Sequence, residues 1–294
     1  MSDLAKTVRS HIEGKLARTQ IEVSPFPHLV VSDFFPEEVY ARILELNVFQ
    51  VSEGKRWLNS GRARATSTET PYFARRQINF HKDGVLDSLR GEHAEFWNEL
   101  SAIFLDDDWF PRLVIDTYRP YFEIRFGDAL ERDDFCQLFR RERFLQRHEP
   151  GYFIGPHTDV PQRVFTCIFS FASEEGFDQY GTQLLSHKDE LTRCFGHNHY
   201  PPEDFTVRKL APYRPNNFLL FFKTRQSFHA VAEIDESVPN QRYGMQFQFY
   251  ETGGGIFTEL SKPDLFVNTR IRKQQTVQTR LMARVRGGLR RFRG

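Results

Sequence analysis

The sequence predicts an α+β protein with a mainly β core, built as a sandwich or barrel and preceded by helices. From about residue 120 onward, short aromatic and β-branched runs are separated by Gly, Pro and Asn, which is typical of antiparallel strands rather than βαβ units. Before that point, apolar residues recur at helical spacing. The 30 Phe among 294 residues indicate a core rich in aromatic side chains.

The N-terminal part predicts helices around one short strand. Over residues 3–20 apolar residues recur every four positions, which is one side of an amphipathic helix. The run FPHLVVSDFF predicts a strand, and Pro36 with two following glutamates predicts the start of the next helix. Further helices are expected near 85–105 and 108–119, and a long polar loop over 50–75.

The second half of the chain predicts the strands of the core. Their sequences are YFEIRFG, RFLQRHEPGYFIG, RVFTCIFSF, GTQLLSH, NNFLLFF, SFHAVAEI and RYGMQFQFYET. We therefore divide the chain into an N-terminal lead-in that packs on the core (1–119), a β core (120–260) and a basic C-terminal tail (261–294). The stretch 186–210 is expected to be a long loop that could form a substrate lid, with His197, His199 and Tyr200 in it.

Composition excludes several classes of protein. The net charge of +1 gives no overall attraction to nucleic acid or membranes, and no specific nucleic-acid partner is predicted. Three cysteines without metal-like spacing fit reduced thiols in a cytoplasmic protein. No secretory segment or run of 18 apolar residues occurs, so no transmembrane segment is predicted. The tail from Arg270 has eight Arg, one Lys and no acidic residue; it is either a solvated end or a contact for anionic surfaces.

His-x-(Asp/Glu) pairs are the first candidate site residues. Ten His and 39 acidic residues in 294 predict about one such pair by chance, and the chain has five. The pairs starting at His11 and His93 lie in predicted helices, where residues two apart point to different sides; those at His81 and His187 lead into a turn and a charged stretch. Only the pair at His157 lies between two apolar strands. In an extended segment, its two side chains point to the same face, where both could bind one ion.

Two later residues extend this pair to a possible site. His229 lies within an apolar stretch, where it is either a third metal ligand or a buried histidine hydrogen-bonded to backbone. A strand follows in which alternation places Arg242, Gly244, Gln246 and Gln248 on one face. Arg242 is either an exposed edge-strand residue or a guanidinium directed into the same cavity, where its planar fork suits a carboxylate. Two His and one carboxylate on one face match the facial triad of Fe(II) oxygenases.

In this order the pieces PHTDVPQRVFTCIFSF, GTQLL, NNFLLFFKTRQSFHAV and NQRYGMQFQFY resemble the Fe(II)- and 2-oxoglutarate-dependent dioxygenases, nearest the prolyl-4-hydroxylase-like branch. The resemblance covers roughly residues 143–251, and the lead-in SPFPHLVVSDFFPEEVYARIL is also similar. It implies a double-stranded β-helix, or jelly roll, flanked by N-terminal helices. It also implies hydroxylation of an unidentified small molecule or peptidyl side chain by O2, with release of succinate and CO2. Ascorbate is a further candidate cofactor.

The resemblance also implies roles for particular residues. His157, Asp159 and His229 would bind Fe(II), and Arg242 would bind the distal carboxylate of 2-oxoglutarate. Three positions depart from the family pattern: Gly244 where a Ser is common, His148 where a Tyr is common, and Gly181-Thr182-Gln183-Leu184 where Gly-Gly-x-Leu is usual. The further candidates for cosubstrate contacts are His148, Thr166, Thr182 and Gln246. Phe169, Phe171, Phe218 and Phe222 are either a dry lining of the site or ordinary core.

Two other functions compete with this interpretation. The departures at Gly244 and His148 would suit a catalytically degenerate, cupin-like protein that only binds a ligand, but the metal ligands and Arg242 are all present. The branch that repairs alkylated bases carries a second Arg six residues after the first, where this chain has Gln248, so nucleic-acid demethylation is disfavoured.

Overall fold

The computed structural model of the chain describes residues 1–51, 58–59, 74–80, 84–105, 107–194, 196, 199–235 and 242–251. Its helices are α1 (Asp3–Arg18), α2 (Glu37–Glu45), α3 (Val48–Val51), α4 (Val85–Ser88), α5 (Gly91–Leu105), α6 (Trp109–Thr117) and α7 (Arg119–Phe126). Its strands are β1 (His28–Val31), β2 (Leu58–Asn59), β3 (Arg75–Asn79), β4 (Phe139–His148), β5 (Ile154–His157), β6 (Arg163–Phe171), β7 (Thr182–His187), β8 (Phe205–Ala211), β9 (Pro215–Phe222), β10 (Phe228–Val231) and β11 (Arg242–Glu251).

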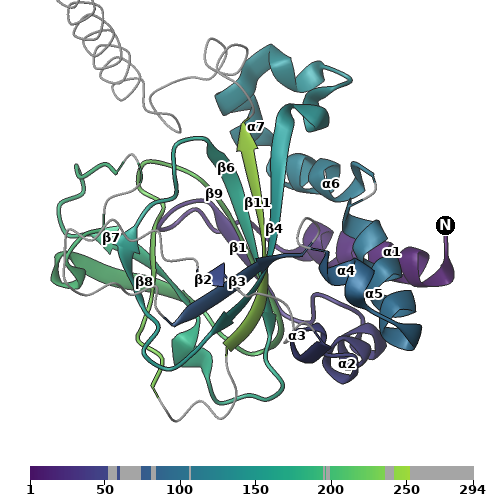
Figure 1. Ribbon diagram of the computed structural model, residues 1–294. Helices are drawn as coiled ribbons and strands as arrows, with labels where there is room; N and C mark the ends of the chain where they lie inside the picture. The colour runs from purple at the N-terminus through teal and green to yellow at the C-terminus, as the bar shows by residue number, and fades with distance from the viewer. Residues whose placement is uncertain are drawn as a thin grey trace, which may run out of the picture.

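The strands form two antiparallel sheets. The larger has the order β1-β9-β6-β11-β4-β3-β2, and the smaller has the order β5-β10-β7-β8. Figure 1 shows the helices gathered on one side of the larger sheet and the smaller sheet on the other. The α+β class with a mainly β core is therefore confirmed. Two strands of the predicted N-terminal lead-in, β1 and β3, pair directly with strands of the core, and the division into three parts stays a prediction.

Alternation along β6 separates its two faces. Phe165, Cys167, Phe169 and Phe171 belong to one large apolar cluster with the helices. The intervening Thr166 and Ile168 point the other way, toward the smaller sheet, since side chains of a strand alternate between faces. Phe218 and Phe222 of β9 belong to the same cluster with the helices. These four phenylalanines at 169, 171, 218 and 222 are therefore core, and the alternative that they line the site is wrong.

Two predicted elements differ from the structure. Residues 119–126 form helix α7 rather than a strand, because Phe122, Arg125 and Phe126 are spaced for one buried helical face and Pro120 occupies its first turn. The stretch 186–210 is not a loop throughout, because strand β8 pairs with β7 within it. The polar loop predicted over 50–75 lies mostly outside the described residues, as does the basic tail.

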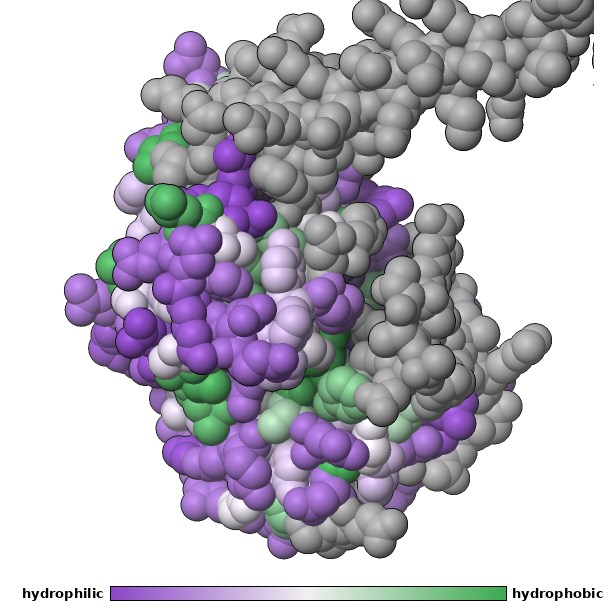
Figure 2. All heavy atoms as spheres, turned by 90° about the vertical axis from the view of Figure 1, so that its left-hand side faces the viewer, coloured by the Kyte–Doolittle hydropathy of each residue, from purple (hydrophilic) through white to green (hydrophobic). Residues whose placement is uncertain are grey.

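The surface over the smaller sheet is mostly hydrophilic, with a few apolar side chains between polar ones (Figure 2). A cleft of about 380 Å³ opens there beside β7 and β10, and its lining includes Leu185, His187, Arg208 and Phe228. None of the helices in the described ranges combines the length and the apolar character that crossing a lipid bilayer requires.

Gly181 lies where β7 begins, against the backbone at the end of β8. A Cβ added there would lie 2.0 Å from the carbonyl oxygen of Ala211 and 2.8 Å from the Cα of Pro212. We therefore expect Gly181→Ala to lower the free energy of unfolding by about 1–3 kcal/mol, measured by urea denaturation. The matched control is Gly14→Ala in helix α1, where the nearest atoms belong to the flexible end of Arg18. It should instead stabilise by up to about 1 kcal/mol; equal effects of both variants would contradict the prediction.

Candidate metal centre

Two histidines and one aspartate converge between the two sheets. His157 ends β5 and His229 lies in β10, and the antiparallel register pairs these two residues directly. Asp159 follows His157 by two residues, and one candidate ligand atom from each of the three side chains lies within 4.8 Å of the others. The structure thus brings the three residues close together, and their joint role as metal ligands stays a prediction. Within the described residues, this is the one such group of His, Cys, Asp or Glu side chains.

Backbone hydrogen bonds orient both imidazoles. Nδ1 of His157 lies 2.9 Å from the carbonyl oxygen of Gly155, and Nδ1 of His229 lies 3.0 Å from that of Ser227. Because a carbonyl oxygen can only accept, each Nδ1 carries the proton and each Nε2 keeps its lone pair. Nε2 of His229 lies 3.8 Å from Oδ1 of Asp159. This is the arrangement in which metal-binding histidines are usually held, so the donor set fits a divalent cation.

The environment keeps the three side chains in the protonation states that a metal requires. Burial lowers the pKa of His157 and of His229, so both imidazoles are neutral at pH 7. Burial alone would raise the pKa of Asp159, but the neighbouring Arg163 guanidinium and a hydrogen bond from Thr166 hold it well below its usual range. The carboxylate is therefore ionised, and no proton has to leave before a cation binds.

Buried neutral histidines predict that the metal-free protein loses stability in acid. His148 and His229 are buried and His157 is partly buried, and burial lowers the pKa of each below the ordinary 6.5. Below about pH 6.5 the unfolded chain therefore binds protons that the folded chain does not, and the free energy of unfolding falls with pH by up to about 1.4 kcal/mol per unit for each histidine. Urea denaturation between pH 7.5 and 5.5 measures this slope. His148→Gln should make the slope shallower; an unchanged slope would contradict the prediction.

Arg242 is buried at the start of β11 and lies opposite His148 of β4. Its Nη1 donates to Nδ1 of His148 at 2.8 Å, and the His148 ring stacks on Tyr152 with centroids 4.1 Å apart. No carboxylate of the described residues pairs with Arg242, and both its Nε and the Nε2 of His148 are buried without a hydrogen-bond partner there. Two unsatisfied buried donors beside an uncompensated charge are costly, which an anionic ligand would remedy.

The structure shows the surroundings of the three positions that depart from the family pattern. A Cβ on Gly244 would lie 2.9 Å from the carbonyl oxygen of Phe169, so β11 passes too close to β6 for a serine without a shift. His148 orients Arg242, as described above. Thr182 is buried at the start of β7, next to Val231 of β10 in the register.

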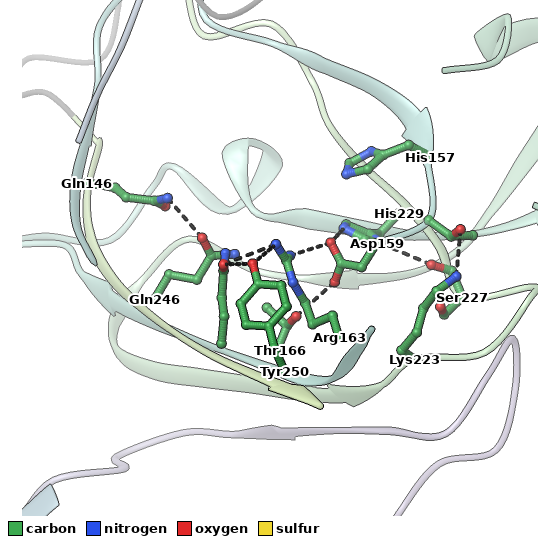
Figure 3. A network of polar contacts seen from close by, with 12 residues as sticks. Gln146, His157, Asp159, Arg163, Thr166, Lys223, Ser227, His229, Gln246 and Tyr250 are labelled. Carbon is green, nitrogen blue, oxygen red and sulfur yellow. Dashed lines mark hydrogen bonds and ion pairs between the residues drawn. The ribbon is translucent and has the colours of Figure 1, made fainter. Parts of the chain in front are cut away.

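The remaining predicted contacts lie on the same inner face. Thr166 donates from Oγ1 to Oδ2 of Asp159 at 2.8 Å, so it supports a metal ligand. Gln246 accepts from the side chain of Gln146 at 2.9 Å (Figure 3). Among the residues that the structure describes, no hydrogen bond or ion pair joins Gln246 to the triad.

Three residues near the site were not predicted as metal or cosubstrate contacts, although His199 was expected in a possible substrate lid. Arg163 donates from Nη1 to Oδ1 of Asp159 at 2.5 Å. Lys223 is buried and donates to Oγ1 of Thr158 at 2.8 Å, and burial lowers its pKa to about 7. The ring of His199 stacks on that of His157 with centroids 4.9 Å apart, and the two residues form a β-bridge. Of these, only Arg163 left a signal in the sequence, a basic residue four positions after the ligand Asp159.

No family model matches the chain, and no curated protein matches it. Among solved structures, a prolyl-4-hydroxylase from Pseudomonas putida is similar over 84% of this chain and 100% of its own, with 13% identity and a TM-score of 0.42. HygX from Streptomyces hygroscopicus, solved with nickel and 2-oxoglutarate bound, covers 76% of this chain and 83% of its own, with 9% identity and a TM-score of 0.43. An oxidoreductase of the 2OG-Fe(II) oxygenase family from Burkholderia pseudomallei covers 85% and 93%, with 15% identity and a TM-score of 0.39.

The superfamily that the sequence resembles, including a prolyl-4-hydroxylase, is thus found again among the solved structures similar to this chain. With TM-scores below 0.5, this likeness carries no weight for the activity, which has to follow from the site itself.

Proposed function

We propose that this protein is an Fe(II)- and 2-oxoglutarate-dependent dioxygenase that hydroxylates a small molecule or a peptidyl side chain and releases succinate and CO2. The observation that carries the proposal is the convergence of His157, Asp159 and His229, with both Nε2 lone pairs free and the carboxylate ionised. Two neutral imidazoles and one carboxylate on one side of an ion leave its other positions open, as Fe(II) oxygenases require. The two facing sheets would then be the two walls of a jelly roll.

In this proposal each part of the site has a separate task. His157, Asp159 and His229 hold the metal, and Thr166 fixes the carboxylate of Asp159 through Oδ2. Arg242, oriented by His148, binds the distal carboxylate of 2-oxoglutarate, which satisfies its buried charge. The bound iron and 2-oxoglutarate together supply the oxidising chemistry, and the protein places the substrate beside them and excludes water.

Anaerobic titration with Fe(II) and 2-oxoglutarate tests the proposal, because the chelate of the two absorbs visible light when bound in such a site. We expect the absorption band in the wild type and its loss in His157→Ala. The matched control is His187→Ala, which alters the histidine of another His-x-Asp pair, at the end of β7, and should keep the band.

A wild type without the band, or a His157→Ala variant that retains it, would contradict the proposal. Binding of 2-oxoglutarate without oxygen-dependent succinate release in any substrate screen would instead favour the catalytically degenerate, cupin-like alternative. A screen of free amino acids, peptides and small metabolites for stimulated succinate release addresses the substrate.

A further inference from the structure

Both oxygens of the Asp159 carboxylate already accept hydrogen bonds from the protein. Oδ2 accepts from Thr166, and Oδ1 accepts from Nη1 of Arg163 at 2.5 Å. Oδ1 is also the oxygen that lies 3.8 Å from Nε2 of His229, on the side where the candidate ligand atoms converge. A fixed positive charge therefore lies beside the oxygen that faces the other ligands, and only 13% of the Arg163 side chain and 5% of the Asp159 side chain are exposed.

Residues of β11 hold Arg163 in this position (Figure 3). Its Nη2 donates to Oε1 of Gln248 at 3.0 Å and lies 2.6 Å from the hydroxyl of Tyr250. The hydroxyl of Tyr250 in turn donates to the same Gln248 oxygen at 2.6 Å, and its ring packs under the guanidinium at 5.1 Å. Two residues of β11 thus keep Arg163 from swinging away from Asp159.

We propose that Arg163 is a positioning residue with a second effect: it fixes the Asp159 carboxylate and weakens divalent-metal binding by the triad, so that firm metal binding depends on an anionic co-ligand. The inference rests on the proposed function, since it concerns the metal of that site. It adds that the anionic co-ligand controls how firmly the metal binds.

The physical basis is the charge around Oδ1. A guanidinium remains protonated at every accessible pH, so Arg163 competes with a metal for the negative charge of Asp159 and repels the metal as well. Burial makes this repulsion stronger than it would be in water. A dianion such as 2-oxoglutarate adds the missing negative charge when it binds. By linkage, the metal and the dianion then strengthen each other's binding, and they do so more than they would at a triad without the Arg163 charge.

Calorimetric titration with Ni²⁺, which is redox-stable, tests this inference without measuring turnover. The proteins are the wild type, Arg163→Gln, which keeps an N–H donor but loses the charge, and Arg163→Lys, which keeps the charge. Without 2-oxoglutarate, Arg163→Gln should bind Ni²⁺ at least about ten-fold more tightly than the wild type, which is the effect expected when Asp159 loses a charged hydrogen bond that competes with the metal. Arg163→Lys should bind Ni²⁺ with an affinity close to that of the wild type. Saturating 2-oxoglutarate should reduce the difference.

Weaker or equal Ni²⁺ binding by Arg163→Gln, in a wild type that does bind Ni²⁺, would overturn the inference and leave the proposed function standing. A wild type that binds no Ni²⁺ at the triad even with saturating 2-oxoglutarate would remove both. If Arg163→Gln does not fold, Tyr250→Phe decides. It removes one hydroxyl that holds Arg163, and it should tighten Ni²⁺ binding by about two- to ten-fold; unchanged affinity overturns the inference.

Discussion

Replacement of Arg242 with glutamine is expected to weaken the binding of 2-oxoglutarate by about 100-fold or more, while Ni²⁺ binding changes by at most a few-fold. The guanidinium is buried, and within the described residues its charge has no carboxylate partner. The substitution therefore removes a desolvated ion pair between Arg242 and the anionic ligand, which is worth at least about 2–3 kcal/mol. Titration of the Fe(II)-loaded variant with 2-oxoglutarate under anaerobic conditions measures the affinity directly.

Arg140→Gln is the matched control for this experiment, because Arg140 lies on β4 as His148 does but has 57% of its side chain exposed. It should bind 2-oxoglutarate as the wild type does. An Arg242→Gln variant with unchanged affinity would exclude Arg242 from cosubstrate binding and leave its buried charge to be explained in another way.

Arg125→Met is expected to lower the free energy of unfolding by about 3–5 kcal/mol. Arg125 of α7 has no exposed side-chain surface, and it forms an ion pair with Glu251 at the end of β11, whose side chain is 6% exposed. Removing the arginine alone leaves a buried carboxylate without a partner, which costs far more than the pair itself contributes. Urea denaturation at neutral pH measures the loss.

The double variant Arg125→Met/Glu251→Leu completes the cycle. It should recover most of the lost stability, because two apolar side chains can replace a buried ion pair at little cost. A single variant that loses less than about 1 kcal/mol would show that Glu251 finds solvent or another donor when Arg125 is gone.

The sequence was most informative where strand alternation and chain order act together. The pair His157 and Asp159 could be separated from four similar pairs because extended neighbours place both side chains on one face, and His229 and Arg242 follow in the expected order. The structure brings the first three together as predicted. Their roles in binding iron, and that of Arg242 in binding 2-oxoglutarate, stay predictions.

The residues that sequence reasoning missed depend on contacts between distant segments. His199 meets His157 only because a stretch some forty residues later in the chain returns to β5, and no local pattern encodes this return. Lys223 ends an apolar strand, where a lysine normally predicts solvent, and its burial beside Thr158 is a tertiary effect. The strand predicted at YFEIRFG is helix α7, because the three- and four-residue spacing of its buried side chains decides the local structure there and its aromatic content does not.

Strand β6 has a consequence for how this protein can change over time. From Phe165 to Phe171 its odd-numbered positions belong to the apolar cluster with the helices, while Thr166 on the other side contacts the ligand Asp159. Substitutions that repack the aromatic layer can therefore accumulate without reaching the reactive side, and the reverse also holds. A single inserted or deleted residue would exchange the two sides at once, so this strand tolerates changes of composition but not of length.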